Sequence, residues 1–159
     1  MTILLYAGIV IATFFFMEFM AWFTHKYVMH GFLWVLHEDH HVKDEGFFEK
    51  NDAFFLIFAV PSFTLFLLGA ASGYDFKFWI GMGILLYGIA YFLVHDVFIH
   101  QRFKALRYSN NTYFRALRKA HKVHHKHLEA PDGECFGMLV VPYKYYKEAL
   151  QSRKTPKAK

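Results

Sequence analysis

The chain has 159 residues, of which 55% are hydrophobic and 21% aromatic, and its formal net charge is +5. A soluble domain of this length leaves a large fraction of its surface in water, so the composition argues against a soluble globular fold. A single cysteine, Cys135, excludes an internal disulfide, and we give it no role. The basic residues flank apolar stretches, and we predict no nucleic-acid partner.

Three apolar stretches follow one another along the chain, at about 3–23, 53–71 and 78–99. Each approaches the roughly 20 residues that a helix needs to cross the hydrocarbon core of a bilayer. A backbone in lipid must satisfy its own hydrogen bonds, so each stretch is predicted to be helical. Residues 72–77 are typical of a turn that joins the second and third stretches into a hairpin.

The predicted fold is therefore an all-α membrane helical bundle with about three to four membrane helices, formed by a single domain over 1–159. Asn51 and Asp52 precede the second stretch and are suited to cap its helix. The start of the chain lacks the basic segment and cleavage site of a signal peptide, so we expect a retained anchor there.

Basic residues predict how the chain is oriented. Lys77 alone lies in the hairpin turn, and all the other Lys and Arg residues lie at 25–52 or 101–159. Cytoplasmic loops carry the excess of Lys and Arg in membrane proteins. The N-terminus and the turn are therefore predicted outside, with a cytoplasmic cap formed by 25–52 and 101–151, in a multi-pass protein of the cytoplasmic membrane.

The last segment mixes basic and aromatic residues. We expect a helix over about 113–127 and a short interfacial helix over about 140–150, with Tyr143, Tyr145 and Tyr146 near the lipid headgroups. Residues 136–141 are too few to span the bilayer. Residues 152–159 are predicted to form a disordered basic tail.

Ten of the eleven histidines fall into four short clusters, in which an HxxxxH motif followed by an HxxHH motif occurs twice. The ten are His25, His30, His37, His40, His41, His95, His100, His121, His124 and His125. Residues i, i+3 and i+4 of a helix share a face, so each HxxHH motif projects its rings together. Five residues turn an α-helix by about 140°, so the HxxxxH pairs require a bulge, an unwound helix end or an approach from the flank. His127 is left over.

The spacing predicts a metal centre at the cytoplasmic face, where the topology places all four clusters. Neutral imidazole is the commonest metal ligand in proteins. Ten rings are too many for one ion, whereas five from each half of the chain suit two. A ligating ring needs an acceptor for its second nitrogen, and Glu38, Asp39 and Asp96 lie beside the histidines, where they are equally suited to be solvated charges.

Glu18 is a further candidate, because an ionisable side chain within an apolar span is expensive and commonly functional. It lies seven residues before His25, on the same helix face. We expect it either to support the metal site or gate the substrate, or to make a structural hydrogen bond within the bundle.

The histidine pattern favours a dinuclear redox centre over a zinc hydrolase, because a zinc hydrolase usually needs three protein ligands, whereas ten histidines occur here in two equal sets. Two irons are expected to use O2 to oxidise a lipid-soluble substrate that enters from the bilayer. No flavin or nicotinamide fingerprint occurs, so electrons are expected from outside, for example from a ferredoxin that docks on the basic surface. The ordinary cytoplasmic excess of positive charge also explains that surface.

The motifs resemble those of the β-carotene 3-hydroxylases, members of the membrane fatty-acid hydroxylase superfamily. The matching stretches are HKYVMHG at 25–31, HEDHH at 37–41, FEKND at 48–52, HDVFIHQRF at 95–103 and HKVHH at 121–125. The resemblance implies hydroxylation of C3 of a β-ionone ring, which converts β-carotene through β-cryptoxanthin to zeaxanthin. It also implies two non-haem irons held by the ten clustered histidines, O2 and reduced ferredoxin.

Two alternatives remain open. A related membrane hydroxylase or desaturase acting on fatty acyl or sterol lipids would keep the histidines and change the substrate tunnel. A metal transporter would place its ligands near mid-membrane, and a haem electron carrier would use few of the histidines.

Overall fold

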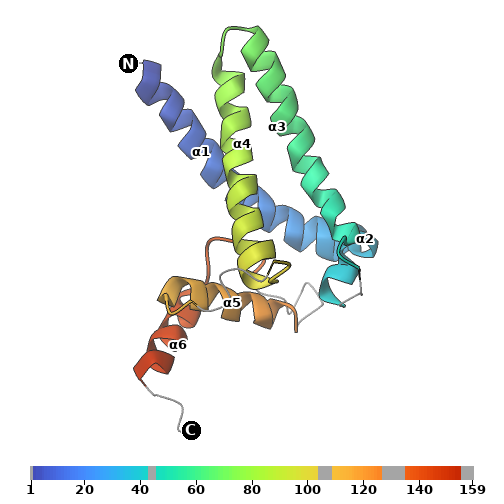
Figure 1. Cartoon of the computed structure of the whole chain (residues 1–159), viewed down its shortest axis with the longest axis vertical. Coiled ribbons are helices and arrows are strands. Elements are labelled where there is room, and N and C mark those ends of the chain that lie inside the picture. The colour runs from blue at the N-terminus through green and yellow to red at the C-terminus, as the bar shows by residue number, and fades with distance from the viewer. Residues whose placement is uncertain (1, 43–45, 104–108, 127–134, 155–159) are drawn as a thin grey trace.

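The structure is a computed structural model that describes residues 2–42, 46–103, 109–126 and 135–154. Within the part of the chain that the structure describes, every regular element is a helix (Figure 1). Its elements in chain order are α1 (Thr2–Phe23), the π-helix η1 (Thr24–Phe32), α2 (Trp34–His41), the 3-10 helix η2 (Lys50–Asp52), α3 (Ala53–Ala71), α4 (Phe76–Phe92), the π-helix η3 (Leu93–Ile99), α5 (Thr112–His124) and α6 (Tyr143–Lys154).

Three continuous helical segments are long and apolar enough to cross a membrane: Thr2–Phe32, Lys50–Ala71 and Phe76–Ile99. They confirm that the three predicted stretches are long apolar helices. The predicted turn is shorter than expected, because the Asp75 side chain accepts a hydrogen bond from the Lys77 backbone at 3.0 Å and caps α4 at its start. Lys77 therefore lies in the first turn of α4.

The three spans pack as a hairpin of α3 and α4, with α1 crossing α4 (Figure 1). Ser62 Oγ donates a hydrogen bond to the Gly81 carbonyl at 2.9 Å and joins α3 to α4 within the bundle. At Gly83, a Cβ atom would lie 2.9 Å from the Val10 carbonyl oxygen of α1. Helices in lipid gain attraction by such close approach, which small residues permit.

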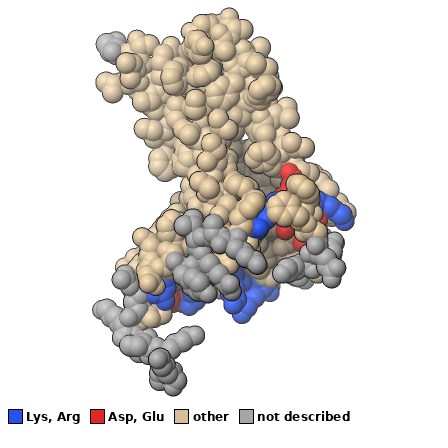
Figure 2. Space-filling view, in the orientation of Figure 1, with Lys and Arg blue, Asp and Glu red and all other residues tan. Residues whose placement is uncertain are grey.

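Large apolar side chains cover the outside of the spans, among them Ile3, which is 83% exposed, and Phe63, which is 65% exposed. On the face seen in Figure 2, charged side chains gather at the end that carries α2 and α5. Lipid is the solvent that accommodates an apolar belt of this kind. The chain is therefore a membrane protein, with its N-terminus and the α3–α4 turn at one end and α2 and α5 at the other (Figure 1).

α5 lies across the end of α4 and packs against α6 (Figure 1). The Asn111 side chain caps α5 by accepting a hydrogen bond from the Tyr113 backbone at 2.8 Å. Between the two helices, Ala116, Leu117 and Ala120 meet Tyr145 in a buried core.

Three expectations for this region need correction. Tyr145 is 2% exposed and packs against α5, so it does not lie at the headgroups. α6 runs on through Ser152, whose Oγ accepts a hydrogen bond from Arg115 Nη2 at 2.6 Å, so the predicted tail begins later. α5 ends at His124. His127 and 155–159 lie outside the described residues.

Candidate metal centre

The HxxxxH pairs lie at the two π-helices: η1 contains His25 and His30, and η3 contains His95 and ends directly before His100. The His95 carbonyl accepts a hydrogen bond from the His100 backbone at 2.8 Å, which is the i→i+5 bond of a π-helix. This wider turn places residues five apart on one side, where an α-helix would separate them by about 140°. The ring centroids of His95 and His100 are 4.5 Å apart, and those of His25 and His30 are 5.1 Å apart. The structure thus selects the bulge among the alternatives left open above.

The histidines converge into two adjoining groups. In each group, one potential ligand atom per residue lies within 4.8 Å of all the others. Group A comprises His25, His30, His37, His41 and His124, and group B comprises His40, His95, His100 and His121.

The expectation of one group per half of the chain was wrong at two positions. His40 of the first half belongs to group B, and His124 of the second half belongs to group A. Consecutive residues of an α-helix point about 100° apart, so His40 and His41 project to different sides of α2. His124 and His125 diverge in the same way at the end of α5.

His125 lies between the groups. Its Nε2 is 2.9 Å from His121 Nε2 of group B, and its ring stacks on His41 of group A with centroids 4.3 Å apart. All ten predicted histidines are therefore gathered at one place in the fold, nine of them in the two groups and His125 at the boundary.

Hydrogen bonds fix which nitrogen of a ring carries the proton. His25 Nδ1 lies 2.9 Å from the Phe136 carbonyl oxygen, and His37 Nδ1 lies 2.7 Å from Asn51 Oδ1. These oxygens only accept, so Nδ1 donates and Nε2 of the neutral ring keeps a lone pair. The two Nε2 atoms face each other at 3.1 Å. Two lone pairs at that distance repel each other unless a cation lies between them.

The spacing of the rings fits such a cation. A divalent transition metal binds imidazole nitrogen at about 2.1 Å, so two nitrogens on one ion lie roughly 3.0–3.4 Å apart. Nε2 atoms are 3.2 Å apart in the pair His30–His124, within this range, and 2.8 Å apart in the pair His100–His121, slightly closer than it. His40 Nε2 is buried with no hydrogen-bond partner among the described residues. The two groups are therefore compatible with a metal site.

Burial keeps these rings neutral, as metal ligation requires. Loss of solvation lowers the pKa of His37 to about 3 and that of His125 to about 4. Burial also lowers the pKa of His40, and the neighbouring histidines add to this effect. At neutral pH each of these rings can offer a lone pair.

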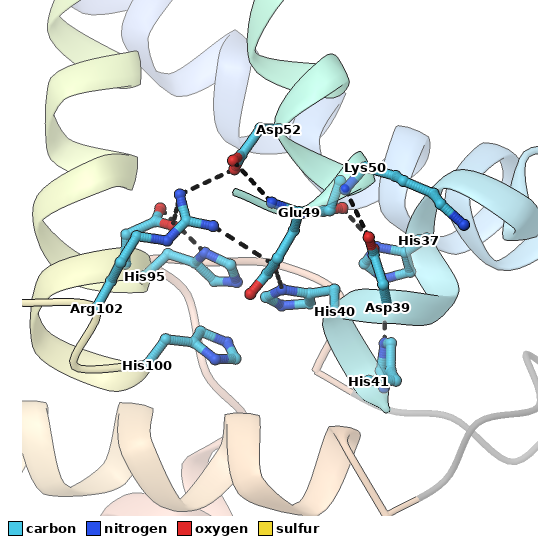
Figure 3. Close-up of polar contacts among 12 residues, drawn as sticks. His37, Asp39, His40, His41, Glu49, Lys50, Asp52, His95, His100 and Arg102 are labelled. Atoms are coloured by element: carbon cyan, nitrogen blue, oxygen red, sulfur yellow. Dashed lines mark hydrogen bonds and ion pairs between the residues drawn. The ribbon is translucent and has the colours of Figure 1, made fainter. Parts of the chain in front are cut away.

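Two acceptors for the outer nitrogens come from η2, the short 3-10 helix before the second span, and from Glu49 directly before it (Figure 3). His40 Nδ1 lies 2.8 Å from Glu49 Oε2, and Asn51 holds His37 as described. Such partners orient a ligating ring and raise its basicity. Asn51 and Asp52 were expected to cap α3, but the Asn51 side chain serves His37, and Asp52 Oδ2 accepts from the Glu49 backbone at 3.1 Å.

Arg102 joins the supports of the site. Its Nη1 lies 2.9 Å from Asp52 Oδ1 and 3.5 Å from Asp96 Oδ1, and its Nη2 lies 3.6 Å from Glu49 Oε2 (Figure 3). Asp96 in turn contacts His95 Nδ1 at 3.3 Å. One guanidinium therefore contacts three carboxylates and links η2 to η3.

The predicted acidic residues lie in different places. Asp96 contacts His95, whereas Glu38 is exposed. Asp39 Oδ2 accepts a hydrogen bond from the Lys50 backbone at 2.6 Å and holds η2 against α2. Glu18 is buried and bonds to Tyr87 and to the segment after Phe136.

Sequence reasoning missed Glu49, Asn51 and Arg102 as supports of the histidines. A signal was present, because FEKND and HDVFIHQRF are the two matching stretches that extend beyond the histidine boxes. Phe136 was also missed, and no motif marks it.

A hollow of about 540 Å³ lies beside group A, between α1 and 135–142. Its lining is largely apolar and includes Phe15, Phe19, Trp22 and Phe136. The Phe136 ring centroid lies 5.2 Å from that of His30 and 5.1 Å from that of His124. Phe136 is therefore the wall between the hollow and the histidines.

Comparison with known proteins agrees with a membrane bundle that carries a histidine-rich site. The chain belongs to the fatty acid hydroxylase family, whose model matches residues 10–142. It is accordingly an oxidoreductase of the hydroxylase class. No solved structure matches the chain.

Among individual relatives, the chain is similar to the beta-carotene hydroxylase of Pseudescherichia vulneris, with 43% identity over 109 residues, which is 69% of this chain and 61% of the relative. The enzyme of the same name from Pantoea ananas is 38% identical over 86% of this chain and 77% of its own length. That from Paracoccus sp. (strain PC1) is 39% identical over 84% and 83%.

Proposed function

We propose that this hydroxylase acts on C3 of the β-ionone rings of β-carotene, giving β-cryptoxanthin and then zeaxanthin. The names of the relatives support the substrate, and the motif resemblance described above supports the position. The observation that carries the metal chemistry is the facing pair of Nε2 lone pairs of His25 and His37, 3.1 Å apart.

The reaction converts a C–H bond, O2, two electrons and two protons into a C–OH group and water. Two irons bound by the ten histidines would supply the oxidising power that an unactivated C–H bond demands. The chain's own part is to hold and orient the rings, through Glu49, Asn51 and the Phe136 carbonyl, and to keep water away from them. The burial of His37 and His124 supports this second role.

The hollow beside group A supports entry of the substrate from the bilayer. Its lining residues Phe15 and Phe19 are 67% and 52% exposed on the outside of α1, where lipid would lie. A carotenoid ring could enter there sideways without crossing water, and its end would meet Phe136 next to group A.

Electrons are proposed to come from an acidic ferredoxin-type donor on the cytoplasmic side. Arg115, Arg118, Lys119 and Lys122 lie on α5, which also carries His121 and His124. Opposite charges speed the encounter of such partners, and salt screens them. Turnover that falls at high salt, with the metal retained, would support docking of the donor. Turnover that does not depend on salt would contradict it. A reporter fused at Lys77 should be found outside the cytoplasm if the proposed orientation is right.

Co-expression with a β-carotene pathway tests the substrate. We expect β-cryptoxanthin and zeaxanthin in the pigment extract, and none of either from a His37→Ala variant that is present in the membrane at the same level. Failure to form any hydroxylated carotenoid, in cells where the wild-type protein holds metal, would contradict the proposal. Lipid analysis of the same cells would then test for hydroxylated fatty acyl or sterol products.

A further inference from the structure

Glu18 of α1 holds the segment 136–140, which we name the strap, by three hydrogen bonds, and it makes a fourth to α4. Its Oε1 accepts from the backbone N–H groups of Met138, Leu139 and Val140 at 3.0, 2.8 and 3.0 Å. Its Oε2 accepts from the Tyr87 hydroxyl of α4 at 2.7 Å. The carboxylate is 9% exposed, so these bonds form away from water.

Four bonds to one buried carboxylate make a strong clamp. Hydrogen bonds to an ionised acceptor are about twice as strong as neutral ones, and a carboxylate offers about four acceptor sites. Glu18 thus uses its acceptor capacity on the strap and on Tyr87. It therefore stabilises the strap against α1 and α4, two of the three membrane spans.

The strap in turn orients group A. The Phe136 carbonyl accepts from His25 Nδ1 at 2.9 Å, and this bond turns His25 Nε2 toward His37. The Phe136 ring packs against His25 and His30 with centroids 5.5 and 5.2 Å apart. A shift of the strap would rotate the His25 ring and move the wall of the hollow.

Gly137 shows how close this contact is. A Cβ atom at position 137 would lie 3.0 Å from Glu18 Oε1. Contacts that short force the neighbour to move, so a larger residue would push the strap away from the carboxylate. The absence of a side chain at this position lets the backbone reach Glu18.

We infer that Glu18 is a positioning residue for group A, which acts through the strap on His25 and not by contact with any histidine. The inference deepens the function proposed above and rests on its metal centre. It assigns group A, and not group B, as the part of the site that depends on Glu18. The strap then couples the shape of the substrate hollow to the orientation of the His25 ring, because Phe136 lines the hollow and its carbonyl binds His25.

Cobalt(II) titration of the purified metal-free protein tests the inference, with the bound metal read from its visible spectrum. Loss of a partner that orients a ligand commonly weakens metal binding 10- to 100-fold. In Glu18→Leu we expect one of two cobalt equivalents to bind roughly 10- to 100-fold more weakly, with the other unchanged. Glu18→Gln keeps an oxygen for the three amides, so it should bind cobalt much more tightly than Glu18→Leu.

Two further variants separate positioning from general damage. Gly137→Ala leaves the carboxylate in place and should weaken the same equivalent, which keeps the test decisive if Glu18→Leu fails to fold. Ser62→Ala removes a buried hydrogen bond between α3 and α4 and should leave both equivalents unchanged.

Wild-type affinity in both Glu18→Leu and Gly137→Ala would overturn the inference, as would equal weakening of both equivalents. If Glu18→Gln and Glu18→Leu lose the same cobalt affinity, the effect comes from the charge of Glu18, and the inference would also be overturned. If the wild-type protein binds no cobalt or iron, the proposed metal centre fails instead, so the two failures are distinguishable.

Discussion

The ring of His40 stacks on that of His95, with centroids 4.7 Å apart and planes 27° from parallel, although the residues lie in different halves of the chain. His41, the next residue, stacks on His125 at the border of group A. α2 therefore contributes to both groups, and α5 does the same through His121 and His124. The two groups are interlocked, and neither can form from one half of the chain.

Because α2 and α5 each contribute to both groups, we can predict which histidine variants weaken binding of the same metal ion. His40→Ala should weaken the same metal equivalent as His95→Ala, and His41→Ala should weaken the other. In the double variant His40→Ala/His95→Ala the loss should be less than additive, because both residues serve one ion. Cobalt titration of the four proteins measures this. If His40→Ala weakens the same cobalt equivalent as His41→Ala, the assignment of His40 to group B is contradicted.

Glu49 should support metal binding although it lies outside every histidine motif. Without its carboxylate, His40 Nδ1 loses its acceptor and the ring is free to turn. We expect Glu49→Ala to weaken metal binding at group B by about 10- to 100-fold. Glu38→Ala is the matched control, because Glu38 is an exposed acidic residue of α2, and its removal should leave metal binding unchanged.

Arg102→Lys should destabilise the protein although it keeps the charge. A lysine cannot present the planar fork that reaches Asp52, Asp96 and Glu49 together. Hydrogen bonds between charged groups contribute about 1.5–3 kcal/mol, so we expect a loss of that order in the free energy of unfolding. Thermal unfolding in detergent micelles provides the measurement.

Lys119→Ala serves as the control for Arg102→Lys. It breaks the ion pair between Lys119 and Glu148, in which both side chains are more than 40% exposed. Exposed pairs contribute about 0–1 kcal/mol, so this variant should unfold close to the wild-type temperature. Equal destabilisation in the two variants would refute the special position of Arg102.

Metal removal should lower the unfolding temperature. The facing lone pairs of His25 and His37 repel each other in the metal-free protein, and a bound ion stabilises the folded state by mass action. At a free metal concentration 100 times the dissociation constant this amounts to about 2.7 kcal/mol. For a chain of this size it corresponds to roughly 5–10 °C. Circular dichroism should show a lower unfolding temperature after chelation and a restored one after ferrous iron is added back.

The parts of this protein that depend on local chemistry could be predicted from the residues alone. The backbone of a single apolar stretch in lipid must satisfy its own hydrogen bonds, which a helix does, so three apolar stretches sufficed to predict the three spans. The second predicted stretch, 53–71, has the same bounds as α3 (Ala53–Ala71). The ten clustered histidines could likewise be selected from spacing alone, because helical periodicity states which residues share a face.

Which partner each helix face meets depends on how the helices pack in three dimensions. Periodicity places His40 and His41 on different sides of α2, but the packing of η3 and α5 determines that His40 joins His95 while His41 joins group A. The same holds for Asn51 and for Tyr145. Asn51 was expected to cap a helix, but it supports His37. Tyr145 was expected at the lipid headgroups, but it is buried against α5. Such contacts join residues far apart in the chain, so no local pattern encodes them.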